Sequence, residues 1–183
     1  MKYILFIFFL FSIINPKIVF DKDEWINRLQ ELTTRSTQYK NEFPYNLLLY
    51  DGSNWWCDCN NLLKALFNER DIYDYTIGKY AWPLTNTGDV TCEGLIGKCT
   101  DVSSDFTALQ EGEPRVLWMS GHIGTYIGKI VDEKYNVIEC TPAWGGGVIY
   151  SWVDPDGTRR REKGGPAIKV WEKHGLPSLW VSY

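Results

Sequence analysis

Two cysteines, Cys57 and Cys59, stand in the stretch "NWWCDCNNLL", and a run with helical apolar spacing follows them. That spacing predicts an amphipathic helix over about residues 58–68. Cys59 falls in its first turn, where unpaired backbone N–H groups and the helix dipole favour a thiolate and lower the pKa of a thiol. Cys59 is therefore the candidate nucleophile. Its position alone is equally compatible with a buried structural thiol or a disulfide cysteine.

A thiolate nucleophile needs a base to manage its proton and a third group to orient that base. His122 follows Ser120-Gly121 at the start of a predicted strand, and Glu139 ends the predicted strand "YNVIE". If the two strands form a hairpin with its turn near Asp132, the side chains of His122 and Glu139 lie on one face, about 5 Å apart. The residues thus predict a Cys59–His122–Glu139 triad. The alternative is a solvent-facing glutamate, which a register slip of one residue would produce.

Other features of the sequence limit which chemistry the chain can perform. The net charge of −4 argues against a nucleic-acid partner. Zinc sites use Cys-x2-4-Cys spacing and nearby histidines, whereas this chain has Cys-x-Cys and two histidines, so neither a metal nor a cofactor is expected. The second histidine, His174, is interpreted as structural. The basic run "TRRREK", residues 158–163, is interpreted as a solvated hairpin tip.

The chain begins "MKYILFIFFLFSIINPKIVF", an apolar run too short for a membrane span and typical of a signal peptide. We assign residues 1–17 to this signal and expect a secreted protein with no membrane association once the signal is removed; an uncleaved anchor or a buried strand is the alternative. In an oxidising compartment five cysteines allow two disulfides and leave one thiol. One arrangement pairs Cys92 with Cys99 and Cys57 with Cys140.

The elements that would position these residues divide the chain into two halves. Helical spacing predicts a helix over 23–39 and the one over 58–68, with one or two short helices near 94–109. Period-two patterns then predict four strands, at 115–119, 122–130, 135–140 and 147–153. Helices followed by a strand meander indicate an α+β fold. Residues 18–43 form an N-terminal helical segment that is a candidate pro-segment or self-association element, ordinary packing on the core being the alternative.

Several motifs resemble one known family. "DCNNLLKALF" is similar to the Asp-Cys-Ser-Gly-Leu motif of the NlpC-type, papain-like peptidoglycan cysteine peptidases, and "LQEGEPRVLWMSGHIGTYIG" and "NVIECT" resemble the family's histidine block and following strand. The resemblance spans about residues 44–151. It implies a papain-like catalytic domain over 44–183, with a nucleophile helix packed on an antiparallel β-sheet. Asn60-Asn61 depart from the family's Ser-Gly.

The resemblance implies Cys59 as nucleophile, His122 as base and Glu139 as orienting residue of a secreted peptidase. Its expected substrate is peptidoglycan, cleaved within the stem peptides as by a D,L-endopeptidase. The alternatives are an N-acetylmuramoyl-L-alanine amidase with the same triad and a non-catalytic secreted wall-binding module. The residues expected to bind substrate or the oxyanion are Tyr50, Tyr45, Asp58, Gly121 and Trp144.

Overall fold

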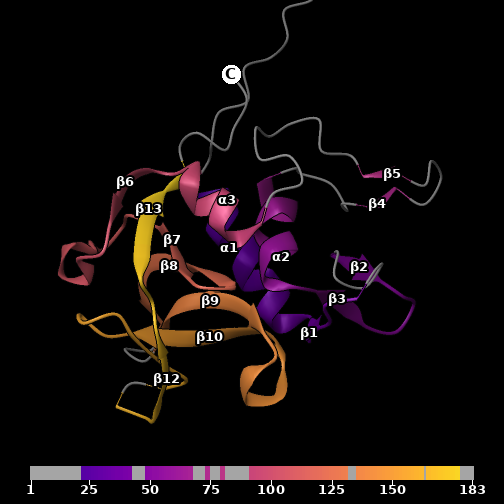
Figure 1. Ribbon diagram of the computed structural model, residues 1–183. Helices are drawn as coiled ribbons and strands as arrows, with labels where there is room; N and C mark the ends of the chain where they lie inside the picture. The colour runs from indigo at the N-terminus through magenta and orange to yellow at the C-terminus, as the bar shows by residue number, and fades with distance from the viewer. Residues whose placement is uncertain are drawn as a thin grey trace, which may run out of the picture.

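The chain has an α+β architecture in which three helices lie together against a large antiparallel sheet, as Figure 1 shows. The computed structural model describes residues 22–42, 48–67, 73–74, 79–80, 91–131, 135–162 and 164–177. The predicted signal peptide and Tyr45 lie outside these ranges. Within the described part of the chain, no helix is long and apolar enough to cross a membrane.

The predicted elements correspond closely to the observed ones. The helices are α1 (Lys22–Thr34), α2 (Cys59–Phe67) and α3 (Cys92–Gly97), with single 3₁₀ turns at Phe106–Ala108 and Ala143–Gly145. The strands are β1 (Gln38–Tyr39), β2 (Leu49–Tyr50), β3 (Trp55–Cys57), β4 (Tyr73–Asp74), β5 (Lys79–Tyr80), β6 (Thr100–Ser103), β7 (Arg115–Met119), β8 (His122–Val131), β9 (Tyr135–Thr141), β10 (Gly147–Val153), β11 (Thr158–Arg160), β12 (Ala167–Val170) and β13 (Lys173–Leu176). The four predicted strands are thus confirmed as β7 to β10.

The main sheet has eight strands in the order β12-β11-β10-β9-β8-β7-β13-β6. Strands β7 to β10 form the predicted meander, and β13 returns to pair with β7 and β6. A smaller sheet, β1-β3-β2, carries the strand that leads into α2. The candidate nucleophile therefore follows a strand of the small sheet, and the candidate base lies on a strand of the large sheet.

Alternate residues of β8 face opposite sides of the main sheet, as period-two side-chain alternation requires. Ile123 and Ile127 belong to the core cluster shared with the helices. On the other side, Tyr126 belongs to a second cluster around Trp171, and His122 stacks on that tryptophan. His122 is the first residue of β8. Its side chain lies on the face of the sheet away from the helices, at the end of the strand near the start of α2.

The N-terminal helix α1 is part of the same core. Its residues Trp25, Ile26, Leu29 and Leu32 are buried in the cluster that contains Cys59. Burial of four large apolar side chains is a substantial share of the hydrophobic stabilisation of a domain of this size. Residues 22–34, within the segment considered as a candidate pro-segment, therefore pack as an integral layer, in line with the alternative of ordinary core packing.

A bulge at Gly128 shifts the β8–β9 pairing. The register changes between Tyr126 and Val131, and Gly128 adopts φ 66° with the backbone of Glu113 only 2.9 Å from where a Cβ would lie. Only glycine tolerates both conditions without strain. Thr125 pairs with Ile138, so Glu139 lies opposite Gly124 rather than opposite His122 as the hairpin prediction had it. The offset is two residues, and it keeps both side chains on one face.

Candidate active site

Asp58 caps the helix that carries the candidate nucleophile. Its carbonyl accepts from the backbone N–H of Leu62 at 3.1 Å, and its carboxylate accepts from the backbone N–H of Asn61 at 2.6 Å. These are the contacts of an N-cap residue, so Cys59 is the first residue of α2. Burial raises the pKa of Asp58 to about 6, against the opposing effect of the Asn61 hydrogen bond. The prediction that Asp58 binds substrate is replaced by a capping role, since its carboxylate is turned to its own helix.

The Cys59 sulfur is the focus of several hydrogen bonds. Cys92 lies beside it, with 3.8 Å between the two Sγ atoms, and both His122 and the backbone N–H of Ile123 also bond to it. The hydrogen bonds from Cys92 and His122 outweigh burial and lower the pKa of the Cys59 thiol to about 5. Cys59 is therefore a thiolate at neutral pH. Its place at the start of α2 adds the favourable end of the helix dipole.

His122 joins the thiolate to a carboxylate. Its Nε2 lies 2.6 Å from Oε2 of Glu139, and a carboxylate can only accept, so Nε2 carries a proton and Nδ1 remains for Cys59. Burial would lower the pKa of His122, but the hydrogen bonds to Cys59 and Glu139 and their negative charges raise it to about 9. The ring also stacks on Trp171 at 5.5 Å. The imidazole is thus a fixed cation between two anions.

Glu139 is a fully buried carboxylate with every oxygen engaged. Besides His122, it accepts from Ser151 Oγ and from Arg159, whose Nε lies 3.0 Å from both oxygens and whose Nη2 lies 2.6 Å from Oε2. Burial would raise the pKa of Glu139, yet the hydrogen bonds of His122 and Arg159 and their charges lower it to about 2. The alternative of a solvent-facing glutamate is wrong.

Arg159 is the site residue that the sequence analysis missed. The run "TRRREK" was interpreted as a solvated tip, whereas Arg159 is 3% exposed and lies in β11, paired with β10. Its neighbour Arg160 bonds to Asp154 at 2.5 Å. The available signal was the pair of consecutive arginines in the three-residue strand β11, because neighbouring side chains of a strand face opposite sides and one arginine is therefore turned inward. The interpretation failed because a charged residue is normally assigned to solvent.

Trp144 contacts Arg159 and does not stand free as a groove wall. The guanidinium carbon of Arg159 lies 4.4 Å from the centre of the Trp144 ring and 5.7 Å from that of Trp171. Trp144 adopts φ 55°, a left-handed conformation that is costly for a bulky side chain. The cation–π contact is one compensation for that cost.

Tyr39 lies close enough to the thiolate for the charge of Cys59 to affect it, and it is not among the residues predicted from the sequence. Tyr39 lies in β1, paired with Cys57, and packs against the core that contains Cys59. Burial, followed by the negative charges of Cys59 and Asp58, raises the pKa of Tyr39 to about 12. Its hydroxyl therefore stays protonated.

Two residues predicted to help bind the oxyanion are engaged elsewhere. Tyr50 is 50% exposed, and its hydroxyl donates to the carbonyl of Gly52 at 3.1 Å. The backbone N–H of Gly121 donates to Glu93 at 3.3 Å. Both predictions are corrected, because a donor already bonded to its neighbour is not directed at a substrate carbonyl.

The cysteines group differently from the predicted pairing. Cys57 and Cys140, predicted as a disulfide pair, lie with their sulfurs 3.1 Å apart but are free thiols. Burial, followed by the Cys57 contact, raises the pKa of Cys140 well above its usual value. The predicted Cys92–Cys99 pair is wrong. The sulfur of Cys92 faces Cys59, while that of Cys99 donates to the carbonyl of Leu95 at 3.6 Å. The intervening helix α3 holds the two residues at opposite ends.

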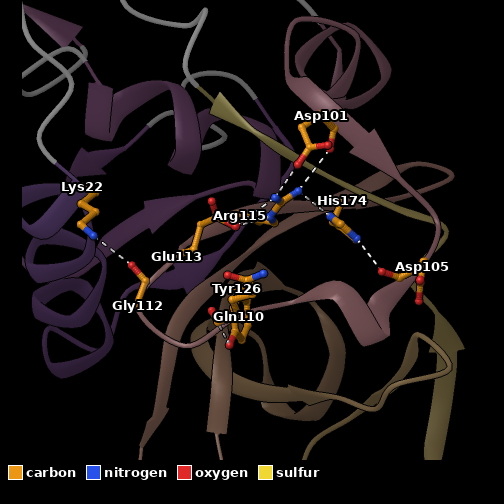
Figure 2. A network of polar contacts seen from close by, with 9 residues as sticks. All are labelled: Lys22, Asp101, Asp105, Gln110, Gly112, Glu113, Arg115, Tyr126 and His174. Carbon is orange, nitrogen blue, oxygen red and sulfur yellow. Dashed lines mark hydrogen bonds and ion pairs between the residues drawn. The ribbon is translucent and has the colours of Figure 1, made fainter.

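His174 has the structural role that the sequence analysis gave it. Figure 2 shows its Nδ1 facing Arg115 at 3.2 Å and its Nε2 facing the carbonyl of Asp105 at 2.9 Å. Arginine can only donate, so Nδ1 accepts and Nε2 carries the proton. The ring ties β13 to β7 and to the turn at Asp105.

A hollow of about 280 Å³ lies beside α3, lined by Glu93, Ile96, Gly97, Val102, Trp118 and Lys173. Glu93 connects it to the turn before His122 through the Gly121 hydrogen bond. Among the described residues, no group of three or more His, Cys, Asp or Glu side chains is arranged to hold a metal ion.

Comparison of the chain with family models, curated proteins and solved structures gives no match. The geometry of the site therefore has to carry the functional argument. That geometry is a low-pKa thiolate, an imidazolium and a buried carboxylate in a line, which is an arrangement suited to nucleophilic attack followed by proton donation.

Proposed function

We propose that this chain is a secreted, papain-like cysteine peptidase that hydrolyses amide bonds in the stem peptides of bacterial peptidoglycan. The supporting observation is the line of hydrogen bonds from Cys59 to His122 and from His122 to the buried Glu139, the latter at 2.6 Å. The substrate class rests on the resemblance of the Asp-Cys and Gly-His motifs to the NlpC-type peptidases.

The proposed reaction is acyl transfer in two stages. The Cys59 thiolate attacks the amide carbonyl, forming a carbon–sulfur bond, and the Nδ1 proton of His122 passes to the leaving amine as the carbon–nitrogen bond breaks. His122, now neutral, takes a proton from water, which attacks the thioester and releases the acid and the thiolate. Glu139 keeps Nε2 protonated throughout, so that Nδ1 remains the atom that exchanges protons with substrate.

Charge that develops on the carbonyl oxygen needs hydrogen-bond donors placed in advance. The backbone N–H of Cys59 is one candidate, since the first N–H groups of a helix have no partner within the helix. The hydroxyl of Tyr39, which the raised pKa keeps protonated near the thiolate, is a second donor in this proposal.

The arrangement of the cysteines favours an enzyme over a non-catalytic wall-binding module. Such a module would use Cys57 and Cys59 as disulfide cysteines, but Cys57 faces Cys140 while Cys59 faces His122. A buried carboxylate that serves only to orient an imidazole has a cost in desolvation and no evident purpose in an inert module.

The test is digestion of purified peptidoglycan by the reduced protein, with Cys59→Ala and Cys99→Ala as paired variants. We expect soluble fragments from the wild type and from Cys99→Ala, and none from Cys59→Ala. Both substitutions remove one buried thiol, so the pair separates loss of the nucleophile from loss of packing. Fragment masses then distinguish cleavage within the stem peptide from cleavage of the amide between muramic acid and L-alanine.

An unchanged wall after treatment with folded wild-type protein would contradict the proposed substrate. Equal activity of Cys59→Ala and the wild type would contradict the proposed mechanism.

A further inference from the structure

The four charged groups of the site form an alternating series, from the Cys59 thiolate through the His122 imidazolium and the Glu139 carboxylate to the Arg159 guanidinium. Glu139 is 0% exposed and Arg159 is 3% exposed, so water screens neither charge. An isolated buried carboxylate takes up a proton rather than remain charged. Something in the protein must therefore hold Glu139 in the ionised form.

Arg159 contacts Glu139 more extensively than any other residue does. Its Nε bonds both carboxylate oxygens at 3.0 Å, and its Nη2 bonds Oε2 at 2.6 Å. The same Nη2 donates to Thr141 Oγ1 at 2.9 Å, and the guanidinium lies over the Trp144 ring. The side chain is thus fixed from several directions.

We propose that Arg159 is a positioning residue: its guanidinium keeps Glu139 ionised, and so keeps His122 charged and directed at Cys59. The inference rests on the proposed cysteine nucleophile but not on any particular substrate. Arginine suits the task because it remains protonated at any physiological pH and presents a planar fork of donors to the carboxylate.

The consequence is a specific pH signature. Without Arg159 the pKa of Glu139 rises, since Arg159 is one of the groups that lower it. At pH values where Glu139 is then neutral, His122 loses the anion that stabilises its charge, and the Cys59 thiolate loses its cation. The midpoint at which Cys59 becomes reactive therefore moves to higher pH.

The test measures the rate at which iodoacetamide alkylates Cys59 as a function of pH, with the alkylated peptide identified by mass. This assay needs no substrate, so it remains valid if peptidoglycan is not cleaved. Arg159→Met should raise the midpoint by at least about one pH unit, the usual effect of losing a contacting opposite charge. Arg159→Lys, which keeps the charge, should largely restore it, and the neighbouring Arg160→Met should match the wild type.

The double variant supplies the decisive comparison. In a Glu139→Gln background, Arg159→Met should cause no further shift, because no carboxylate remains to be held ionised. A wild-type midpoint in folded Arg159→Met would overturn the proposal, and so would an equal shift in the Glu139→Gln background. If Arg159→Met does not fold, Arg159→Lys still tests the proposal. Lysine keeps the positive charge, so a midpoint raised by a full pH unit in Arg159→Lys would contradict the role assigned to the charge of Arg159.

A different observation, the placement of Cys92, independently carries a second inference. The Sγ atoms of Cys59 and Cys92 are 3.8 Å apart, both residues are at most 8% exposed, and Cys92 begins α3 while Cys59 begins α2. Closing this gap to the length of a disulfide, about 2.0 Å, needs a small movement of side chains at two helix ends. We propose that Cys59 and Cys92 form a reversible disulfide that switches the site off.

The switch needs an oxidant, and a small disulfide such as oxidised glutathione suffices. The Cys59 thiolate attacks one sulfur of that disulfide and releases one glutathione thiolate, giving a mixed disulfide. Cys92 then loses its proton and attacks the Cys59 sulfur, which releases the second glutathione thiolate. Two protein thiols are oxidised as one small disulfide is reduced.

The charge of Cys59 explains why Cys92 does not react before the mixed disulfide has formed on Cys59. The hydrogen bond to the Cys59 thiolate, followed by burial, raises the pKa of Cys92 far above its usual value, so Cys92 is a neutral donor in the reduced site. Once Cys59 is in a mixed disulfide, that thiolate is gone and the largest cause of the shift disappears. Cys92 is then able to attack.

The test exposes the folded protein to oxidised glutathione and maps its cysteines by non-reducing mass analysis. The wild type and Cys99→Ala should yield a Cys59–Cys92 linkage and lose iodoacetamide reactivity, which dithiothreitol restores. Cys92→Ala should instead retain glutathione on Cys59. Recovery of wild-type Cys59 only as the glutathione adduct, or linked to Cys57 or Cys99, would overturn the proposal, whether or not peptidoglycan proves to be the substrate.

Discussion

Two histidines on one sheet lie beside an arginine and carboxylates, and the two clusters are built in opposite order. At His122 the carboxylate of Glu139 stands between the ring and Arg159. At His174 the guanidinium of Arg115 faces the ring directly, and the carboxylates of Asp101 and Glu113 lie on the far side of that arginine (Figure 2).

The order of the groups decides what each imidazole can do. The ring of His122 faces a carboxylate and gains a stabilising anion when it takes up a proton, whereas the Nδ1 atom of His174 already accepts a hydrogen bond from Arg115. Solvent contributes to the contrast, because Glu139 is fully buried whereas the side chain of Asp101 is 63% exposed. Similar residue types thus build the candidate proton-transfer site at the start of β8 and a structural tie on β13.

The largest expected difference is in activity. His122→Ala removes the group that holds and relays the proton, and should reduce kcat by about 10³-fold or more. His174→Ala should leave kcat within a few-fold of the wild type at a temperature where the variant is folded, while lowering Tm, because it leaves Arg115 and the carbonyl of Asp105 without a buried partner. Peptidoglycan digestion measures kcat, and thermal unfolding measures Tm. Equal losses of activity would remove the distinction between the clusters.

The next difference is in stability. Glu139→Gln leaves the buried Arg159 without a counter-ion, which typically costs about 3–5 kcal/mol of the free energy of unfolding. Asp101→Asn should leave that free energy nearly unchanged, since an exposed ion pair contributes little. Urea unfolding followed by tryptophan fluorescence compares the two variants. A large loss in Asp101→Asn would show that the exposed carboxylates of the His174 cluster matter more than their solvation suggests.

The two clusters should also differ in their effect on the pH dependence of activity. The Cys59–His122 ion pair exists above the pKa of Cys59, about 5, and below that of His122, about 9, so kcat/KM should be bell-shaped with limbs near those values. Glu139, with its pKa lowered to about 2, stabilises the fold above the unfolded-state pKa of about 4.3, and that contribution is lost as the pH falls toward 2. The pH profile of kcat/KM checks the first statement, and the free energy of unfolding measured at decreasing pH checks the second. Limbs that move in Glu139→Gln but stay in place in His174→Ala would assign them to the first cluster, and limbs that move only in His174→Ala would contradict that assignment.

The smallest effect concerns a single hydroxyl. Ser151→Ala removes one donor to Glu139 and should cost about 1 kcal/mol of stability, with a modest fall in kcat, because Arg159 still holds the same oxygen. Glu113→Gln, which removes a charge from the second cluster, should leave kcat unchanged. Steady-state kinetics on both variants measures the difference, and a fall in kcat for Glu113→Gln alone would contradict it.

Most of the secondary structure was predictable because its signals are local. Period-two alternation located β7 to β10, and the apolar stripe after Asp58 located α2 within about a residue. The Cys59–His122–Glu139 grouping was also predictable, although the assumed register was offset by two residues. Between Tyr126 and Val131 the pairing changes by three residues, and at Tyr126 its net offset from the predicted register is even, so the same face is kept.

What escaped prediction depends on contacts between distant segments. Arg159 enters the site only because β11 pairs with β10, and the consecutive arginines of β11 do not by themselves show which of the two faces the core. Tyr39 was passed over for the same reason, since a two-residue strand carries almost no periodic signal and its position is set by pairing with β3. Cys92 was assigned to Cys99 by their proximity in sequence, whereas the packing of α3 against the sheet turns it to Cys59.

The dependence of a buried carboxylate on an arginine from β11 has a bearing on biosynthesis. The ribosome delivers Cys59 early and Arg159 late, so a partial chain that ends before β11 holds Glu139 without its counter-ion. Such a chain should show a thiol of ordinary reactivity toward iodoacetamide when released at residue 153. In the proposed enzyme, the low-pKa thiolate would therefore form only after Arg159 has been synthesised.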